Sequence, residues 1–387
     1  MPSGDSATLD RPTRIRVDLD ALTHNLRALR AHAGVPVMAI VKANAYGHGL
    51  VPVGRHLQAQ GVERLGVAFL EEGIALRRAG VTVPILVMGG IFGPQAAALI
   101  AHDLEITVSS IDKLRQVEAA AAAAGRRAAV HLKIDTGMER IGVHSGNAGP
   151  FIAAALASPH CAIRGIYSHL ASADDPASPA TARQLERFFH ACAHFDRHGA
   201  PMPLRHLANS GGVLHFPETR LDLVRPGIAL YGVLPDPASR SPVALRPALT
   251  LQSQVVYFKV VPAGQPVSYG GTWAPGVDTR VVTIPIGYGD GFPRALSGRG
   301  AILLRGRRHP IVGRICMDQF MVDLGPDGTG YNEDDAVLIG VQGDEAIRCE
   351  DVAAAAGTIP YEILVNLNTR IPRDYVGGAG NPRGDAV

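Results

Sequence analysis

The sequence predicts an α/β protein in which a (β/α)8 barrel is followed by a mostly β C-terminal domain. The chain has 387 residues, which exceeds the usual size of a single hydrophobic core. In its first part, short apolar runs alternate with helical stretches, as in a barrel of βα units. Near Pro235 this alternation ends, and strand-like runs are then separated by Gly, Pro and Asp turns with little helix between them. An open doubly wound sheet is the alternative for the first part.

The elements before the barrel are a tail, a strand and a helix. Residues 1–12 are polar and are expected to be a disordered tail. A strand is expected at residues 14–19, and it is free to pair with the second domain. Asp20 is the expected cap of a helix that ends at Gly34 and whose apolar positions recur at helical spacing, namely Leu22, Leu26 and Leu29.

The barrel is expected over residues 13–240. Its strands are short, apolar and buried on both faces, as in parallel sheets, and we place them at 37–41, 65–69, 85–88, 105–108, 130–135, 163–169, 205–208 and 223–231. Helical patterns lie between them, among others at 71–79, 111–124 and 180–198. These eight strands are the number that closes a barrel.

The second domain is expected over residues 241–376. A Pro, Ser and Arg-rich stretch at 234–248 is typical of a linker. The strands expected beyond it lie at 249–261, 281–286, 301–304, 321–324 and 336–339. Residues 377–387 are expected to be a disordered tail.

Composition excludes several classes of function. The net charge is +2, and no aromatic-interleaved basic face indicates a nucleic-acid partner. Neither a signal-peptide core nor a run of eighteen apolar residues is present, so we expect a cytoplasmic protein that does not bind membranes. The four cysteines are far apart and lack metal-ligand or redox spacing, so no metal is expected; they are Cys161, Cys192, Cys316 and Cys349.

Lys42 is the first candidate for chemistry. It directly follows the apolar run 37–41, and burial lowers the pKa of a lysine and so favours the neutral amine that forms a Schiff base with an aldehyde. Tyr46, Gly47, His48 and Gly49 follow in a polar loop where a ligand could bind. The alternative interpretation is a surface lysine whose stem covers apolar residues.

Polar residues also end the later barrel strands, where the active site of a barrel lies. They are Lys133, Asp135, Arg140, His169, Asn209, Ser210, Arg225, Gly227 and Ile228. Ser210 and Gly227 follow the seventh and eighth strands, whose loops commonly bind phosphate in such barrels. Otherwise the Asn-Ser-Gly-Gly segment is only a helix cap and the Arg-Pro-Gly segment only a turn.

The segment VKANAYGHG at residues 41–49 resembles the cofactor-lysine motif of the alanine racemases, and the resemblance extends from about Arg14 to Tyr375. It implies that Lys42 carries pyridoxal 5'-phosphate as an internal aldimine. It further implies that Arg225 faces the pyridine nitrogen, with His206 orienting it. The other implied cofactor-binding residues are Tyr46, Ser210, Gly227, Ile228 and Tyr361 at the phosphate, and His169 and Asn209.

The resemblance also implies a two-base mechanism. Lys42 would be one base, and Tyr269, in the segment VSYGGTW, would be the other. In the family this tyrosine comes from the second subunit, which implies a homodimer with composite sites. Arg140 would orient the substrate, supported by a carbamylated Lys133, while Met317 and Asp318 would close the pocket. Glu139 departs from the family pattern and could compete for Arg140.

The implied activity is interconversion of L- and D-alanine, which supplies D-alanine for peptidoglycan. A broad-specificity amino-acid racemase or a serine racemase on the same fold is the alternative. A decarboxylase of this fold is disfavoured, because such enzymes place an acid at the ring nitrogen, where this chain has Arg225.

Overall fold

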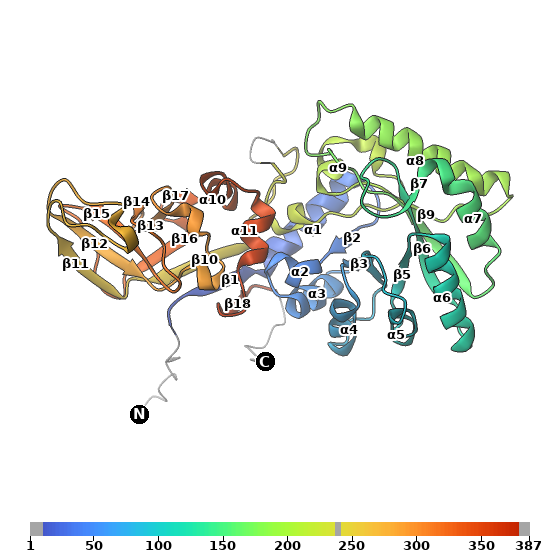
Figure 1. Cartoon of the computed structure of the whole chain (residues 1–387), viewed down its shortest axis with the longest axis horizontal. Helices are drawn as coiled ribbons and strands as arrows, with labels where there is room; N and C mark the ends of the chain where they lie inside the picture. The colour runs from blue at the N-terminus through green and yellow to red at the C-terminus, as the bar shows by residue number, and fades with distance from the viewer. Residues whose placement is uncertain (1–10, 237–240, 379–387) are drawn as a thin grey trace. The chain divides into compact units, whose positions relative to one another are not determined.

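The computed structural model describes residues 11–236 and 241–378. The chain divides into two compact units, each described separately below. One unit spans Leu19–Ala248 together with residues 377–378, and the other combines residues 11–18 with 249–376. The first is a barrel and the second is built mainly of strands (Figure 1).

The barrel unit contains a parallel sheet whose strands follow the order β2-β3-β4-β5-β6-β8-β9, with the short β7 beside β6. These strands are Met38–Ile40 (β2), Arg64–Val67 (β3), Ile85–Val87 (β4), Glu105–Val108 (β5), Ala128–Asp135 (β6), Val143–His144 (β7), Cys161–Tyr167 (β8) and Leu204–His206 (β9). An extended segment at residues 222–226 closes the ring. The amide of Met38 donates to the Val224 carbonyl at 2.8 Å, and the amide of Arg225 donates to the Ala208 carbonyl at 3.0 Å. The predicted barrel is confirmed.

Helices lie around these strands (Figure 1). They are Leu19–Ala33 (α1), Lys42–Tyr46 (α2), Leu50–Ala59 (α3), Leu70–Arg78 (α4), Gln95–Ala101 (α5), Ile111–Ala123 (α6), Ala148–Leu156 (α7), Ala180–Arg197 (α8) and Ser210–His215 (α9). The helix α1 begins at Leu19, so Asp20 lies in its first turn and is not its cap. Its predicted apolar positions are buried, and Gly34 follows its end with φ of 70°.

One predicted barrel strand is wrong in its second half. Residues 223–231 were expected to be extended throughout, but Ile228–Tyr231 forms a 3-10 helix. Pro226 cannot donate to a neighbouring strand, and Gly227 adopts φ of −108° and ψ of −96°, outside the strand region. The chain therefore turns at the carboxyl end of the closing segment, which brings the amides of residues 227–229 to that end of the barrel.

The second unit contains a ten-stranded sheet with the order β11-β12-β15-β14-β13-β16-β10-β1-β18, and β17 pairs with β16. Its strands are Arg14–Asp18 (β1), Leu249–Gln254 (β10), Tyr257–Val261 (β11), Thr279–Ile284 (β12), Ala301–Leu304 (β13), Arg307–Val312 (β14), Phe320–Gly325 (β15), Asp335–Gln342 (β16), Glu345–Ile347 (β17) and Arg373–Val376 (β18). Two helices follow β17, namely Cys349–Ala356 (α10) and Pro360–Asn366 (α11). Side chains of β10 and β15 alternate between buried and half-buried positions, as on a sheet with one packed face.

Two differences from expectation stand out in this unit. The run 249–261 is two strands, because Val255 donates to the Asp334 carbonyl whereas Val256 donates to the Thr283 carbonyl, so the chain changes partners there. The strands β14, β17 and β18 were not predicted. The N-terminal strand β1 pairs with β10 and with β18, which is the pairing with the second unit that the sequence had left open.

The tails predicted at 1–12 and 377–387 lie largely outside the described residues, as do residues 237–240 of the predicted linker. Their described residues make contacts. Arg11 forms an ion pair with Asp290, and the amide of Gly378 donates to Asp20 at 3.0 Å. Within residues 11–236 and 241–378, no helix is long and apolar enough to cross a membrane.

Candidate active site

The site begins with an unusual turn that directly follows β2. Residues 43–46 all have positive φ, between 52° and 54°, so the short helix after Lys42 is left-handed. Such a conformation costs about 1–2 kcal/mol per residue when a Cβ is present. Two side chains hold it: Glu72 accepts from the amide of Ala43 at 2.6 Å, and Asn44 accepts from the amide of Leu50 at 2.8 Å. Strain held in this way is typical of functional segments.

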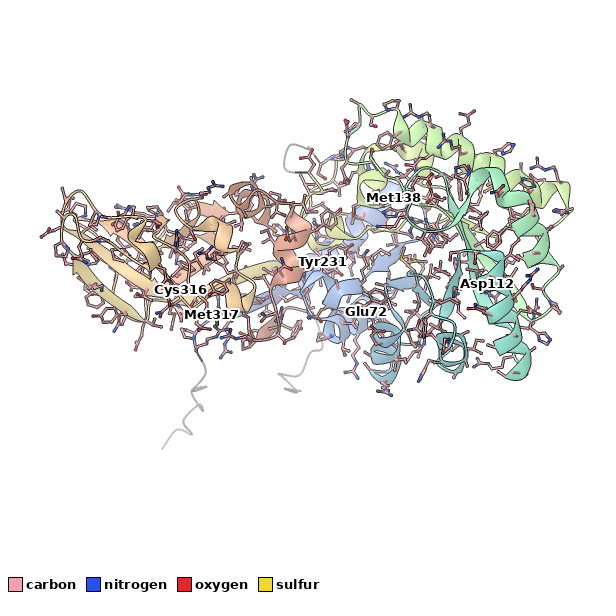
Figure 2. The ribbon with its side chains drawn as sticks, in the orientation of Figure 1. Glu72, Asp112, Met138, Tyr231, Cys316 and Met317 are labelled. Carbon is pink, nitrogen blue, oxygen red and sulfur yellow. The ribbon has the colours of Figure 1, made fainter. Side chains whose placement is uncertain are left out.

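Lys42 lies where this turn begins. Burial lowers the pKa of its amine, and the charge of Arg140 acts in the same direction, while Glu72 opposes them. Glu72, labelled in Figure 2, lies on α4 and also accepts from the amide of Ala68 at 2.7 Å, so it ties the turn to the end of β3. The amine is therefore held at the carboxyl end of β2 with an increased neutral fraction, as a nucleophile requires.

A cluster of polar groups lies where the last two barrel strands end. The hydroxyl of Ser210 accepts from the amides of Gly227 at 2.9 Å and Ala229 at 3.3 Å. Asn209 caps α9 by accepting from the amide of Gly212 at 3.0 Å. A Cβ at position 227 would collide with the hydroxyl of Tyr46, so only glycine lets the backbone approach this tyrosine. Tyr46, Ser210 and Gly227 are therefore brought together as predicted.

Arg225 is the most deeply buried charged group of this cluster, with 2% of its surface exposed. Its guanidinium donates to Nδ1 of His206 at 3.0 Å, to the carbonyl of Ser168 at 2.7 Å and to that of Leu207 at 3.1 Å. Burial lowers its pKa to about 10. Among the described residues no carboxylate forms an ion pair with Arg225, so the group that it faces is under a strong positive field.

Lys133 and His169 lie in the same positive environment. The ammonium of Lys133 is 4.7 Å from the centre of the Tyr167 ring, and burial and the charge of Arg225 lower its pKa strongly. The same two causes place the pKa of His169 well below its ordinary value, so its ring is neutral. Nδ1 of His169 lies 3.5 Å from Nη2 of Arg225, at the limit of a hydrogen bond.

Asp135 shapes the loop that carries Arg140. Its carboxylate accepts from the amides of residues 137–139 and from that of Arg140, at distances between 2.8 and 3.2 Å. Burial opposes its ionisation, but these hydrogen bonds lower its pKa below the ordinary value. Glu139 has an exposed side chain and lies 3.9 Å from His144, so in the described part of the chain it forms no ion pair with Arg140.

Two predicted residues of the second unit, Tyr269 and Met317, are exposed. Tyr269 is 70% exposed, and Met317, which Figure 2 shows beside Cys316, is 53% exposed. Hydrogen bonds hold the backbone at or beside each: the hydroxyl of Ser268, which precedes Tyr269, donates to the Arg314 carbonyl at 2.6 Å, and the amide of Gly289 donates to the Met317 carbonyl at 2.8 Å.

Two further predicted residues lie elsewhere in this unit. Asp318 pairs with Arg370 at 2.7 Å, and Tyr361 lies in the first turn of α11. The predicted site residues are therefore divided between the two units, and the barrel holds the buried ones.

Comparison with known proteins gives the chain a family. The family model for "Alanine racemase, N-terminal domain" matches residues 17–235, and the family model for "Alanine racemase, C-terminal domain" matches residues 248–375. The chain belongs to the alanine racemase family. An alanine racemase of Symbiobacterium thermophilum is 42% identical over 368 residues, which are 95% of this chain and 98% of that protein.

Solved structures agree. The alanine racemase of a D-cycloserine-producing Streptomyces lavendulae has a TM-score of 0.91 at 42% identity, covering 95% of this chain and 98% of that one. The alanine racemase of Bartonella henselae, solved with covalently bound pyridoxal phosphate, has a TM-score of 0.86 at 30% identity, covering 95% and 100%. The family consists of pyridoxal-phosphate-dependent isomerases, so the chain is an enzyme of that class.

The residues of this family member fit the cofactor. An amine with a lowered pKa suits an aldehyde carbon, and the hydroxyls and amides around Ser210 suit a phosphate group. The glycine at position 227 leaves room beside Tyr46 that a Cβ would fill. A guanidinium donates only, so Arg225 suits an unprotonated ring nitrogen.

Sequence analysis missed several residues of this alanine racemase site. Glu72 holds the left-handed turn by accepting from the amide of Ala43. It also accepts from the amide of Phe69 at the start of α4, and this capping pattern is a signal by which Glu72 could have been identified from the sequence. Tyr231 donates to the Ile40 carbonyl at 2.9 Å, and its ring centre lies 4.9 Å from that of Tyr46. His131 lies two residues before Lys133 on β6, and the period of a strand puts both on one face.

Proposed function

We propose that this member of the alanine racemase family interconverts L- and D-alanine with two bases, Lys42 and Tyr269 of the partner subunit. The observation that carries the proposal is that the reactive side chains lie in two different environments. At the barrel end the Lys42 amine is partly buried and the amides at Ser210 and the Arg225 guanidinium are buried, whereas the tyrosine is exposed on the other unit. Racemisation requires removal of a proton from one face of Cα and its return on the other.

Pyridoxal phosphate is the proposed cofactor, held by Lys42, with Tyr46, Ser210, Gly227 and Ile228 of the barrel binding its phosphate group. When bound, it supplies an electron-withdrawing ring that makes the Cα–H bond of an attached amino acid acidic. Nζ of Lys42 removes or returns the Cα proton on one face, and Oη of Tyr269 of the partner subunit does so on the other. Arg140 neutralises the carboxylate of the substrate.

Arg225 is proposed to donate to the ring nitrogen. It is already fixed by three acceptors, so it presents its remaining donors without rearrangement. Because a guanidinium keeps its proton, the nitrogen stays unprotonated and the ring withdraws fewer electrons than a protonated ring would. This favours return of the proton over side reactions, and it supports a racemase over a decarboxylase.

Lys133 is proposed to be carbamylated. As an ammonium it is buried close to Arg225 and Arg140, whose charges lower its pKa. A neutral amine can add to CO2 with release of a proton, which replaces a repelled cation with an anion that accepts hydrogen bonds from Arg140. His169 and Asn209 are proposed to line the cofactor, and His206 to orient Arg225.

The working unit is proposed to be a homodimer with two composite sites. Tyr269 and Met317 are large side chains exposed on a backbone that hydrogen bonds hold in place, as expected for residues that meet a second surface. A wall of Met317 and Tyr269, with Asp318 at its entrance, would admit a methyl side chain. Discrimination against one extra group is worth about 1–3 kcal/mol, so serine is expected to be a slow substrate.

The cellular role follows from the family. We propose that the enzyme supplies D-alanine for peptidoglycan and acts in the cytoplasm. Its four cysteines are free, and three are buried, which suits a reducing compartment.

The test is subunit mixing of two inactive variants, Lys42→Ala and Tyr269→Phe. Each homodimer lacks one base at both sites, but a mixed dimer has one site with both. Random exchange of equal amounts should therefore restore about a quarter of wild-type racemisation, measured by entry of solvent deuterium into Cα of L- and D-alanine.

The control is to mix each variant with itself, which should restore nothing. Activity that stays absent in mixed dimers, shown to form by mass spectrometry, would place both bases in one chain and overturn the composite site. Exchange with another amino acid but not with alanine would overturn the substrate assignment.

A further inference from the structure

A row of hydrogen-bonded side chains runs through the barrel interior from the amino ends of the strands to Arg225. Glu105, the first residue of β5, pairs with Arg64 and accepts from Nε2 of His131 at 3.1 Å. Nδ1 of His131 lies 2.9 Å from Nε2 of His206, and Nδ1 of His206 lies 3.0 Å from Arg225. Both histidines are fully buried, and Glu105 is 7% exposed.

The chemistry of the two ends allows one proton arrangement. A guanidinium only donates, so Nδ1 of His206 must accept, and a neutral His206 then carries its proton on Nε2. That proton points at Nδ1 of His131, which must also accept. His131 therefore carries its proton on Nε2 and donates it to Glu105, an ionised carboxylate that only accepts. Arg225 at one end and Glu105 at the other thus both require the tautomer that is protonated at Nε2, in His206 and in His131.

The surroundings hold this row in place. The ring of His206 is stacked on that of Tyr167, with centres 4.6 Å apart and planes 7° apart. A Cβ at position 165 would collide with Nδ1 of His131, so Gly165 on the neighbouring strand makes room for the ring. Thr107 fixes the hydroxyl of Tyr167 at 2.7 Å. Neither imidazole can turn over without displacing a neighbour.

We propose that Glu105 and His131 are positioning residues, which fix the Nε2-protonated tautomer of His206 and thereby hold the Arg225 guanidinium in place for the cofactor ring. The row ends at the carboxylate of Glu105, which also pairs with Arg64, and two imidazoles lie between that carboxylate and Arg225. The proposal rests on the proposed function only for what Arg225 faces.

The protonation states agree with this arrangement. Burial lowers the pKa of both His131 and His206, and the charge of Arg225 acts in the same direction. Glu105 raises the pKa of His131, but burial outweighs it, so the net shift at both rings favours the neutral form. Burial would raise the pKa of Glu105, but its hydrogen bonds to His131 and Arg64 lower it to about 2. A plain ion pair between Arg64 and Glu105 is the competing explanation, and it assigns the histidines no role.

The experiment measures the tautomers directly. Solid-state 15N NMR of the full-length holoenzyme, labelled at the histidine rings, separates protonated from unprotonated ring nitrogens. Difference spectra with His131→Asn and His206→Asn assign the two rings. We expect protonated Nε2 and unprotonated Nδ1 in both. A protonated Nδ1 in either ring overturns the proposal, whether or not the enzyme racemises alanine, so its failure is distinguishable from that of the proposed function.

Two variants then separate positioning from stability. Glu105→Gln keeps an acceptor for His131, and we expect unchanged tautomers and a dissociation constant for pyridoxal phosphate within about threefold of wild type. Glu105→Leu removes the acceptor, and we expect mixed tautomers at His206 and about tenfold weaker binding of pyridoxal phosphate. Glutamine removes the charge that pairs with Arg64 but keeps the acceptor for His131. Normal tautomers and cofactor binding in Glu105→Gln would therefore not be explained by the ion pair alone.

The matched control is Glu63→Leu. Glu63 also pairs with an arginine, Arg30 at 3.0 Å, and accepts from the amide of Val37 at 3.1 Å, but it contacts neither His131 nor His206. We expect its loss to leave both tautomers and the binding of pyridoxal phosphate unchanged. Equal weakening in Glu63→Leu and Glu105→Leu, or in Glu105→Gln and Glu105→Leu, would overturn the positioning role. If Glu105→Leu does not fold, the wild-type tautomers still decide the assignment.

Discussion

The carboxyl end of the barrel and the loops around Tyr269 hold chemistry-bearing groups under opposite conditions. At the barrel end, Arg225 is 2% and Lys133 is 3% exposed, and the pKa of each is lowered by burial. In the β unit, Tyr269 is 70% and Met317 is 53% exposed. One set is removed from water within its own unit, whereas the other meets solvent in the single chain.

This difference explains why the chain carries both sets. A cofactor site needs an amine and a guanidinium whose positions and protonation states are set before the ligand arrives, and burial provides that. Tyr269, the proposed second base, has no such burial within its own unit. The proposed dimer would cover it with a second surface.

The comparison predicts that substitution at the barrel end costs stability. In Arg225→Leu, His206 and the carbonyls of Ser168 and Leu207 lose a donor, and the free energy of unfolding should fall by about 3 kcal/mol or more. Urea unfolding followed by circular dichroism measures it. The control is Arg115→Leu on the exposed face of α6, expected within about 0.5 kcal/mol of wild type. Equal effects of both variants would break the comparison.

Substitution on the exposed side should cost activity alone. Tyr269→Phe is expected to lower racemisation by about 100-fold, mainly in deprotonation of L-alanine, because general base catalysis contributes at least that much. Its free energy of unfolding should change by less than about 0.5 kcal/mol. Deuterium entry from each enantiomer measures the first. Tyr257→Phe, at another exposed tyrosine of the same unit, should retain full activity. A large fall in the free energy of unfolding of Tyr269→Phe would show that the residue has a structural role.

A pH series should show a further difference of the barrel interior. The pKa of Glu105 is lowered from 4.5 to about 2, so its ionised form stabilises the folded state fully above pH 4.5. This contribution is lost as the pH falls through that range. Between about pH 6 and about pH 3, wild type should therefore lose more unfolding free energy than Glu105→Gln, which lacks the titrating group. Parallel losses in both proteins would contradict the assignment.

The smallest effect is expected in the left-handed turn. Ala43 has φ of 53°, where glycine is unstrained, so Ala43→Gly should raise the free energy of unfolding by about 0.5–1 kcal/mol. Ala119→Gly, at an exposed position inside α6, should lower it by about 1 kcal/mol. Urea unfolding compares the two. A loss of stability in Ala43→Gly would mean that the turn is not strained.

Local patterns were sufficient for much of the fold. The strands β5 and β13 begin and end at the predicted residues, because short apolar runs bounded by polar turns define a buried strand. The barrel-end residues were found for the same reason: a polar side chain directly after an apolar strand is visible without knowledge of its neighbours. The family motif around Lys42 added the cofactor and the chemistry.

Other features depend on contacts between distant residues. The segment Lys-Ala-Asn-Ala-Tyr does not predict a left-handed turn, because alanine and tyrosine disfavour this conformation. Glu72, from another helix, stabilises the turn. Residues 223–231 form one largely apolar run, so the bend after Pro226 could not be predicted from the sequence. Strand β1 pairs with β10 and β18. Local patterns could not identify these partners, because they lie more than two hundred residues further along the chain.

The sequence alone therefore determined which residues could do chemistry and at which strand ends they lie, because side-chain type and hydrophobic period are local properties. The tertiary structure decided their protonation and their orientation. Burial, charge and hydrogen-bond direction at Lys42, Arg225 and the His131–His206 pair come from side chains far along the chain, and only folding brings those side chains together.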